Sequence, residues 1–213
     1  MGFDSAPELI WYASYGSNMH ADRFRHYLEG GTPPGGRRAC PGSRDPRPPR
    51  RTGGHRTPGG VYFATESQVW GGGRAFLDPE LPGSAALRAY LVTPGQFADV
   101  VAQEMYREPG GDLDLREVLR TGRQVIGPGR YETLLHVGER DGHPVLTFTA
   151  PWSAAEVPLL APSAEYLRML LGGLRAGQGW DARTAAEHLA AMPGARGSWR
   201  AADIARLADR PED

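Results

Sequence analysis

The stretch WYASYGSNM, residues 11–19, places the tightest constraint on the fold, because an apolar run ends there in a glycine turn. Residues 9–15 predict a buried strand, and residues 20–28 predict a short helix. A strand that enters a helix through Gly16 leaves several backbone N–H groups unpaired, and the helix dipole adds positive potential to them. Such a turn can bind a carboxylate or an oxyanion, although many glycine turns only connect elements. Asn18, the only asparagine in the chain, lies within this turn.

The rest of the chain alternates irregularly between strand and helix patterns. Strands are expected at residues 61–65, 74–77 and 87–92, a hairpin at 131–137 and 145–150, and helices at 94–106, 162–176, 182–191 and 199–208. Thr93 and Gln96 have the spacing of a capping box at the start of the first of these helices. The strict strand–helix alternation of a doubly wound sheet is missing. The pattern therefore predicts an α+β fold in a single domain, residues 1–213.

The segment between residues 30 and 60 differs from its surroundings, because it consists mainly of Gly, Pro and Arg. It predicts a long loop at about residues 32–58. Seven arginines between Arg37 and Arg56 face a single carboxylate, Asp45. Two interpretations follow: a solvated connection, or a lid that contacts an anionic substrate. No aromatic residue is interleaved with the charge, and the net charge of the chain is -1, so nucleic-acid binding is disfavoured.

Composition excludes several kinds of chemistry. All 24 cationic residues are arginine, so no mechanism can use a lysine nucleophile, Schiff base or phosphate-loop lysine. Six histidines never occur at the spacing of a zinc site, which disfavours a zinc hydrolase or deacetylase, and we expect no metal. Ser17 is not in a GxSxG motif, and Cys40 lies in the Gly/Pro/Arg segment. Neither is expected to be an activated nucleophile.

The ends and the hydropathy of the chain also limit its location. The first residues lack the pattern of a signal peptide, and no run of eighteen apolar residues occurs. We expect a soluble cytoplasmic protein that associates with neither membrane nor nucleic acid. The richness in Gly, Ala, Pro and Arg is typical of a GC-rich bacterial gene.

Glu104 occupies an unusual position on the helix that starts at Pro94. Phe97, Val100 and Val101 define a buried stripe, and the next position in that series is Glu104. A carboxylate on a core face can act as a proton acceptor and donor in catalysis. The alternative is that the helix ends early and Glu104 faces solvent or an arginine.

Several short motifs occur in an order that resembles the γ-glutamylcyclotransferase family. They are Tyr15-Gly16-Ser17-Asn18-Met19, Trp70-Gly71-Gly72-Gly73, Gln103-Glu104, Gly129-Arg130-Tyr131, Gly142-His143, and Pro162-Ser163-Ala164-Glu165-Tyr166 followed by Gly173 and Gly179. The resemblance covers roughly residues 11–192. It implies a small mixed β-barrel with peripheral helices. It also implies an enzyme, without a cofactor, that cuts a γ-glutamyl amide when the α-amino group attacks the γ-carbonyl carbon, giving 5-oxoproline and an amine.

The resemblance also implies roles for particular residues. Glu104 matches the catalytic acid/base, and the substrate-binding matches are Tyr15, Gly16, Ser17, Asn18 and Met19 in the turn and Tyr131 and Tyr166 at the pocket. About sixteen residues, 111–126, look inserted, and Ala150 stands where some members have another tyrosine. These departures put the identity of the leaving amine in doubt more than the reaction. Two alternatives remain: an amide hydrolase or acyl-transfer enzyme that uses the same Glu104, and a non-catalytic binding module. The sequence leaves the oligomeric state open.

Overall fold

A computed structural model describes residues 7–33 and 38–209 of the chain. Its main sheet has six strands in the order β2-β5-β1-β8-β7-β6. The strands are β1 (Ile10–Ser14), β2 (Arg51–Pro58), β5 (Ser84–Val92), β6 (Arg123–Val125), β7 (Thr133–Arg140) and β8 (His143–Thr149). The first strand lies inside the sheet, antiparallel to β5 and parallel to β8. The turn that follows β1 therefore starts from a strand that is held on both sides.

A second sheet consists of the hairpin β3 (Gly60–Glu66) and β4 (Gly73–Asp78). Thr149 at the end of β8 links it to the main sheet. The Thr149 hydroxyl donates to the Leu77 carbonyl at 2.7 Å and accepts from the Leu77 N–H at 3.1 Å. One side chain thus takes the place of a strand-to-strand backbone pair between β8 and β4. The α+β class is confirmed.

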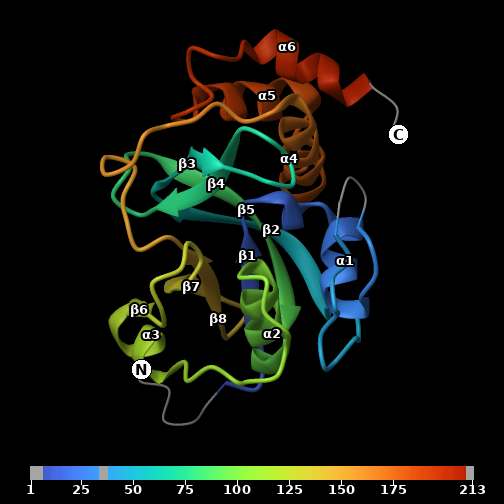
Figure 1. The fold of residues 1–213 in the computed structure, drawn as a ribbon, viewed down its shortest axis with the longest axis vertical. Helices are drawn as coiled ribbons and strands as arrows, with labels where there is room; N and C mark the ends of the chain where they lie inside the picture. The colour runs from blue at the N-terminus through green and yellow to red at the C-terminus, as the bar shows by residue number, and fades with distance from the viewer. Residues whose placement is uncertain (1–6, 34–37, 210–213) are drawn as a thin grey trace.

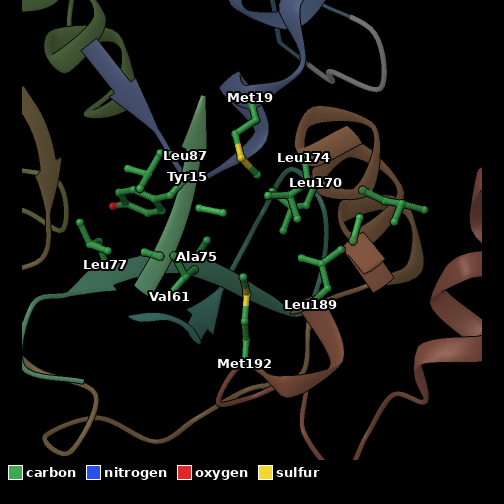
Figure 2. Close-up of a cluster of buried hydrophobic side chains, with 14 of the residues drawn as sticks. Tyr15, Met19, Val61, Ala75, Leu77, Leu87, Leu170, Leu174, Leu189 and Met192 are labelled. Carbon is green, nitrogen blue, oxygen red and sulfur yellow. The ribbon is translucent and has the colours of Figure 1, made fainter. Parts of the chain in front are cut away.

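A large apolar core lies between the two sheets and the C-terminal helices. These helices are α4 (Ala164–Gln178), α5 (Ala182–Ala191), α6 (Ala201–Ala205) and the 3-10 helix η2 (Arg206–Asp209), and they gather at one end of the molecule (Figure 1). Figure 2 shows Met19 directed toward Leu170 and Leu174 of α4. At Gly173 a Cβ atom would lie 2.4 Å from the Cβ of Met19. The missing side chain of Gly173 therefore allows α4 to pack directly against the chain that follows β1.

The other face of the main sheet carries α1 (Ala21–Glu29) and α2 (Pro94–Glu104). Alternate residues of β1 serve the two faces, because Trp11 belongs to the first core and Tyr12 to a second, aromatic one. The expected capping box starts α2: Thr93 accepts from the Gln96 N–H, and Gln96 accepts from the Thr93 N–H. A short helix, α3 (Arg116–Thr121), precedes β6.

The structure corrects the sequence analysis in two places. The expected loop at 32–58 is wrong over residues 51–58, which form the edge strand β2, and residues 34–37 lie outside the described residues. Two glycines hid this strand. Gly54 is needed there, because a Cβ would lie 2.5 Å from the Gly177 carbonyl, whereas a Cβ at Gly53 would meet the end of the flexible Arg140 side chain at 2.7 Å. The sequence analysis also missed α3 and β6 within residues 111–126. Within the described residues, no helix has the length and apolarity needed to cross a membrane.

Candidate functional site

The turn after β1 is held firmly from several sides. After Gly16 the chain makes one turn of 3-10 helix, η1 (Ser17–Met19). Tyr90 donates to the Asn18 carbonyl at 2.7 Å, and Arg88 donates to the Met19 carbonyl at 3.0 Å. The first N–H groups of a helical turn have no acceptor inside the turn, and here they belong to Ser17 and Asn18. The geometry thus provides backbone donors in a fixed position, as the glycine turn predicts.

Asn18 connects this turn to Glu104. Its side-chain Nδ2 donates to Glu104 Oε1 at 3.0 Å and lies 3.4 Å from the Tyr12 hydroxyl. Its Oδ1 is buried and has no hydrogen-bond partner among the described residues. An orphaned acceptor on a residue that is only 2% exposed is costly unless a ligand fills the gap. Asn18 therefore both orients the carboxylate and presents a vacant acceptor.

Glu104 is the last residue of α2 and is half-buried. The adjacent Gln103 fixes the end of this helix, because its side-chain amide donates to the Tyr27 carbonyl at 2.9 Å. The Glu104 carboxylate contacts Asn18. The described residues therefore do not support the alternative in which Glu104 faces open solvent or pairs with an arginine.

Glu104 stands where two hollows meet. We call them the inner pocket and the outer cleft. The inner pocket, of about 320 Å³ with its open mouth included, is lined by Tyr12, Ser14, Tyr15, Gly16, Ser17, Asn18, Ala75, Glu104, Tyr131, Phe148 and Tyr166. The outer cleft encloses about 870 Å³, its open mouth included. Ser17, Glu104, Tyr131 and Tyr166 line both. A molecule that extends from one hollow into the other would pass beside the Glu104 carboxylate.

The tyrosines of the inner pocket use their hydroxyls to hold its walls. Tyr15 donates to the Phe148 carbonyl at 2.7 Å. Tyr131 donates to the Ala75 carbonyl at 3.1 Å, and Tyr166 accepts from the Ala75 N–H at 3.3 Å. Burial raises the pKa of all three phenols well above its ordinary value, so they remain protonated. Tyr166 therefore keeps a hydrogen available for donation, close to Gly16, where a Cβ would come within 3.3 Å of its oxygen.

Of the seven residues expected to bind the glutamyl group, six line the inner pocket: Tyr15, Gly16, Ser17, Asn18, Tyr131 and Tyr166. The exception is Met19, whose side chain points into the core between the sheets (Figure 2). Its contribution is its carbonyl, which fixes the turn through Arg88.

Sequence reasoning missed several residues of the site. Arg23 lines the outer cleft, is 5% exposed, and donates to the Ser17 hydroxyl at 3.0 Å. The sequence did contain a signal for Arg23. This residue lies on the same helical stripe as Phe24 and Tyr27, just as Glu104 lies on the apolar stripe of α2. Tyr12 was also missed, and a buried strand full of aromatic residues offers no mark that distinguishes a pocket residue from a core residue.

Glu132 is a further residue that the sequence reasoning missed. Its buried carboxylate accepts from the Gly129 N–H at 2.6 Å and pairs with Arg107 at 2.5 Å. A Cβ at Gly127 or Gly129 would lie 2.5 Å or 2.4 Å from this carboxylate, so a side chain at either position would displace Glu132 from these contacts. This segment, residues 127–132, is called the Glu132 turn. It places Arg130 at the outer cleft, where Arg130 donates to the Glu104 carbonyl at 3.1 Å.

In the part of the chain that the structure describes, no group of three or more His, Cys, Asp or Glu side chains could hold a metal ion. The polar groups gathered at the site are instead amide, phenol and guanidinium groups around the carboxylates of Glu104 and Glu108.

Comparisons with known proteins give one curated relative. No protein-family model matches the chain. The chain is similar to histone deacetylase 5 of Arabidopsis thaliana, with 34% identity over 189 residues, which cover 80% of this chain and 29% of the plant protein. The chain thus spans less than a third of the length of that relative.

Solved structures give a likeness of fold. The chain is similar to the human protein loc79017, whose structure is described as that of an uncharacterized protein, with a TM-score of 0.52, 14% identity, and coverage of 96% of this chain and 100% of that one. A γ-glutamyl cyclotransferase is also found, with a TM-score of 0.47, 14% identity, and coverage of 93% and 99%. The chain therefore shares the fold of the human structure over nearly its whole length.

Proposed function

We propose that this protein is a cyclotransferase that releases an amine from a γ-glutamyl amide and forms 5-oxoproline. The observation that carries the proposal is the position of Glu104, a half-buried carboxylate held by Asn18 at the boundary between a small inner pocket and an open outer cleft. The inner pocket suits the glutamyl group, which is common to all such substrates. The outer cleft suits the leaving amine, which varies.

In this proposal the inner pocket supplies polar groups for each end of the glutamyl unit. The N–H groups of Ser17 and Asn18 donate to its oxygens. The vacant Oδ1 of Asn18 accepts a hydrogen from the α-amino group, which places that nitrogen close to Glu104. The free hydrogen of the Tyr166 hydroxyl donates to the substrate from the opposite wall.

The proposed reaction closes a five-membered ring. The lone pair of the α-amino nitrogen attacks the γ-carbonyl carbon, a new C–N bond forms, and the carbonyl oxygen becomes an oxyanion. Glu104 accepts the proton that the attacking nitrogen gives up. When the oxyanion collapses, the original amide C–N bond breaks, and Glu104 returns the proton to the departing amine. 5-Oxoproline and the free amine then leave, with Glu104 in its starting state.

So few catalytic groups are sufficient because nucleophile and electrophile belong to one molecule. A pocket that folds the glutamyl chain correctly gains an effective molarity of about 10⁵ M or more. The residues then have to move one proton and stabilise one oxyanion, and neither task requires a cofactor.

The identity of the acidic product separates this proposal from its rivals. The protein is incubated with a panel of γ-glutamyl amides, and the products are identified by mass spectrometry, with the Glu104→Gln variant as the matched control. We expect 5-oxoproline from the unmodified protein and almost none from the control. Free glutamate would instead indicate a hydrolase that uses the same carboxylate, and no product from any amide would indicate a binding module.

Because the plant relative is named a histone deacetylase, the same experiment also tests a deacetylase substrate. An acetyl-lysine peptide is included, with and without EDTA. We expect no deacetylation, and we expect EDTA to leave the release of 5-oxoproline unchanged. Acetate release that EDTA abolishes and zinc restores would replace the proposal with a metal-dependent amide hydrolase.

A further inference from the structure

The outer cleft carries an excess of positive charge that the proposed reaction does not use. Five arginines line it, namely Arg23, Arg38, Arg74, Arg107 and Arg130, together with the two carboxylates Glu104 and Glu108. The excess is three positive charges, and it falls to two if Arg107 is counted as neutralised by Glu132. Arg23 lies on α1 and Arg74 on β4. Arg107 follows α2, and Arg130 lies in the turn before Glu132.

The remaining arginines of the cleft have no carboxylate partner among the residues that the structure describes. Arg74 donates to the Glu66 carbonyl, and Arg130 to the Glu104 carbonyl. Arg23 uses its Nε for the Ser17 hydroxyl, while its buried Nη1 has no hydrogen-bond partner among the described residues. A guanidinium that is 5% exposed with an unpaired N–H is costly to fold, and an oxyanion in the cleft would satisfy it.

Aromatic rings hold these guanidinium groups in place from behind. Arg23 lies 4.8 Å from the centre of the Trp70 ring, and Trp70 in turn stacks on Tyr166 at 5.7 Å. Arg38 and Arg130 lie 5.3 Å and 4.8 Å from the centre of the Tyr106 ring. A ring against the face of a guanidinium leaves its N–H edge free, and that edge is the one that binds carboxylate or phosphate in a fork.

The segment first considered as an arginine lid contributes little of this charge. Of its described arginines only Arg38 lines the cleft. Arg44 pairs with Asp99 and Asp112, and Arg47 pairs with Asp45. Four of the five arginines of the cleft therefore come from other parts of the fold around Glu104, and the segment contributes Arg38.

We infer that the outer cleft selects leaving amines that carry at least two negative charges, such as an amino acid with a second carboxylate or a phosphate. This inference rests on the proposed function, because the cleft begins at Glu104. One carboxylate of the leaving amine can bind one guanidinium group, and the cleft then still carries an excess of positive charge. A second anionic group compensates that remaining charge. A neutral or cationic amine compensates none of it.

The test compares four substrates that differ only in the amine: γ-glutamyl-O-phosphoserine, γ-glutamyl-aspartate, γ-glutamyl-alanine and γ-glutamyl-methylamide. We expect kcat/KM for the first two to exceed that for γ-glutamyl-alanine by about tenfold or more, since a charged hydrogen bond is worth at least that factor. The order of the first two substrates distinguishes a phosphate site from a carboxylate site. The preference should shrink as salt is added.

Variants identify the residues responsible. Arg38→Gln and Arg74→Gln should each lower the ratio of kcat/KM for γ-glutamyl-O-phosphoserine to that for γ-glutamyl-alanine by about tenfold. Arg183→Gln is the matched control, because Arg183 is an exposed arginine of α5 paired with Glu187 and does not line the cleft. It should leave the ratio unchanged.

Calorimetric binding of free O-phosphoserine separates failure of this inference from failure of the proposed function. Equal kcat/KM values for all four substrates, or a ratio that neither cleft variant changes, overturn the inference and leave the cyclotransferase in place. No 5-oxoproline from any substrate, but binding of O-phosphoserine that Arg74→Gln abolishes, overturns the function and supports the anion site. No binding and no preference overturn the anion site.

Discussion

The inner pocket and the outer cleft meet at Glu104 but are built in different ways. Regular elements form most of the inner pocket: β1, the η1 turn, β8 and α4, with the hydroxyls of Tyr15 and Tyr131 bonded to backbone carbonyls. Ends of elements and connections form much of the outer cleft, and its arginines have few carboxylate partners among the described residues. The difference fits the division of labour that we propose, in which the inner pocket determines the reaction and the outer cleft determines which amine leaves.

The Glu104→Gln variant should have the largest effect on activity, and it tests the role of the inner pocket in the reaction. Glutamine keeps an oxygen that accepts from Asn18 but cannot move the proton, so we expect kcat to fall at least about a hundredfold. The loss should be the same factor for every leaving amine, because the carboxylate serves the shared chemistry. Circular dichroism and the melting temperature should match those of the unmodified protein. More than a tenth of the original turnover would sink the assignment.

The wall of the outer cleft gives the next largest effect, and its size depends on which partner of the Arg107–Glu132 ion pair is removed. Arg107→Gln leaves the buried carboxylate of Glu132 without its cation, and we expect the free energy of unfolding to fall by about 2 kcal/mol. Glu132→Gln leaves an Arg107 side chain that is 59% exposed and can turn to solvent, so its cost should be smaller. Urea denaturation of both variants measures the two costs. Equal costs would mean that the pair behaves as a surface ion pair and does not hold the turn.

Inner-pocket tyrosines should show a cost in stability as well as in activity. Tyr166→Phe removes the acceptor of the Ala75 N–H, and Tyr131→Phe removes the donor to the Ala75 carbonyl. Each change should lower the free energy of unfolding by about 1 kcal/mol. Only Tyr166→Phe should also lower kcat/KM, and it should do so equally for all four substrates. A loss that depends on the leaving amine would assign Tyr166 to the outer cleft.

His188 provides a small effect away from both regions. Burial, together with the nearby charge of Arg56, lowers the pKa of His188 below its ordinary value of 6.5. The unfolded chain therefore binds this proton more strongly, and stability is lost as the pH falls below about 6.5. His188→Phe keeps a ring against Trp180 but removes the titration. The melting temperature should then fall less between pH 7 and pH 5 than it does in the unmodified protein, while the substrate preference stays the same.

The two regions also differ in how far sequence alone could predict them. Periodicity placed β1, α2, the β7–β8 hairpin and α4 within a few residues, and the motifs named Asn18 and Glu104, which the structure brings into contact. The elements depend on local patterns, since a strand and an apolar stripe are visible in adjacent residues. Of the eleven residues that line the inner pocket, seven were named from the sequence, and Tyr12, Ser14, Ala75 and Phe148 were not.

The outer cleft depends on contacts between segments that are distant in the chain. Arg23 and Arg74 line the same cleft as Arg130, and nothing near any of these arginines in the sequence indicates the others. The edge strand β2 was missed for a similar reason. Its Gly54 is required by the Gly177 carbonyl, which lies far along the chain, and by itself the segment has the composition of a loop.

That same composition has a consequence for association between molecules. β2 lies at the end of the main sheet, where an unpaired strand would ordinarily be a template for a strand of another molecule. Side chains from elsewhere already bond to it: Arg140 donates to the Gly54 carbonyl at 2.7 Å, and Gln178 donates to the His55 carbonyl at 3.2 Å. Arg51 pairs with Asp141, and Arg56 donates to the Ser84 carbonyl. We therefore expect the stretch whose sequence least resembles a strand to pair poorly with a second copy, because side chains of its own chain already occupy part of its edge.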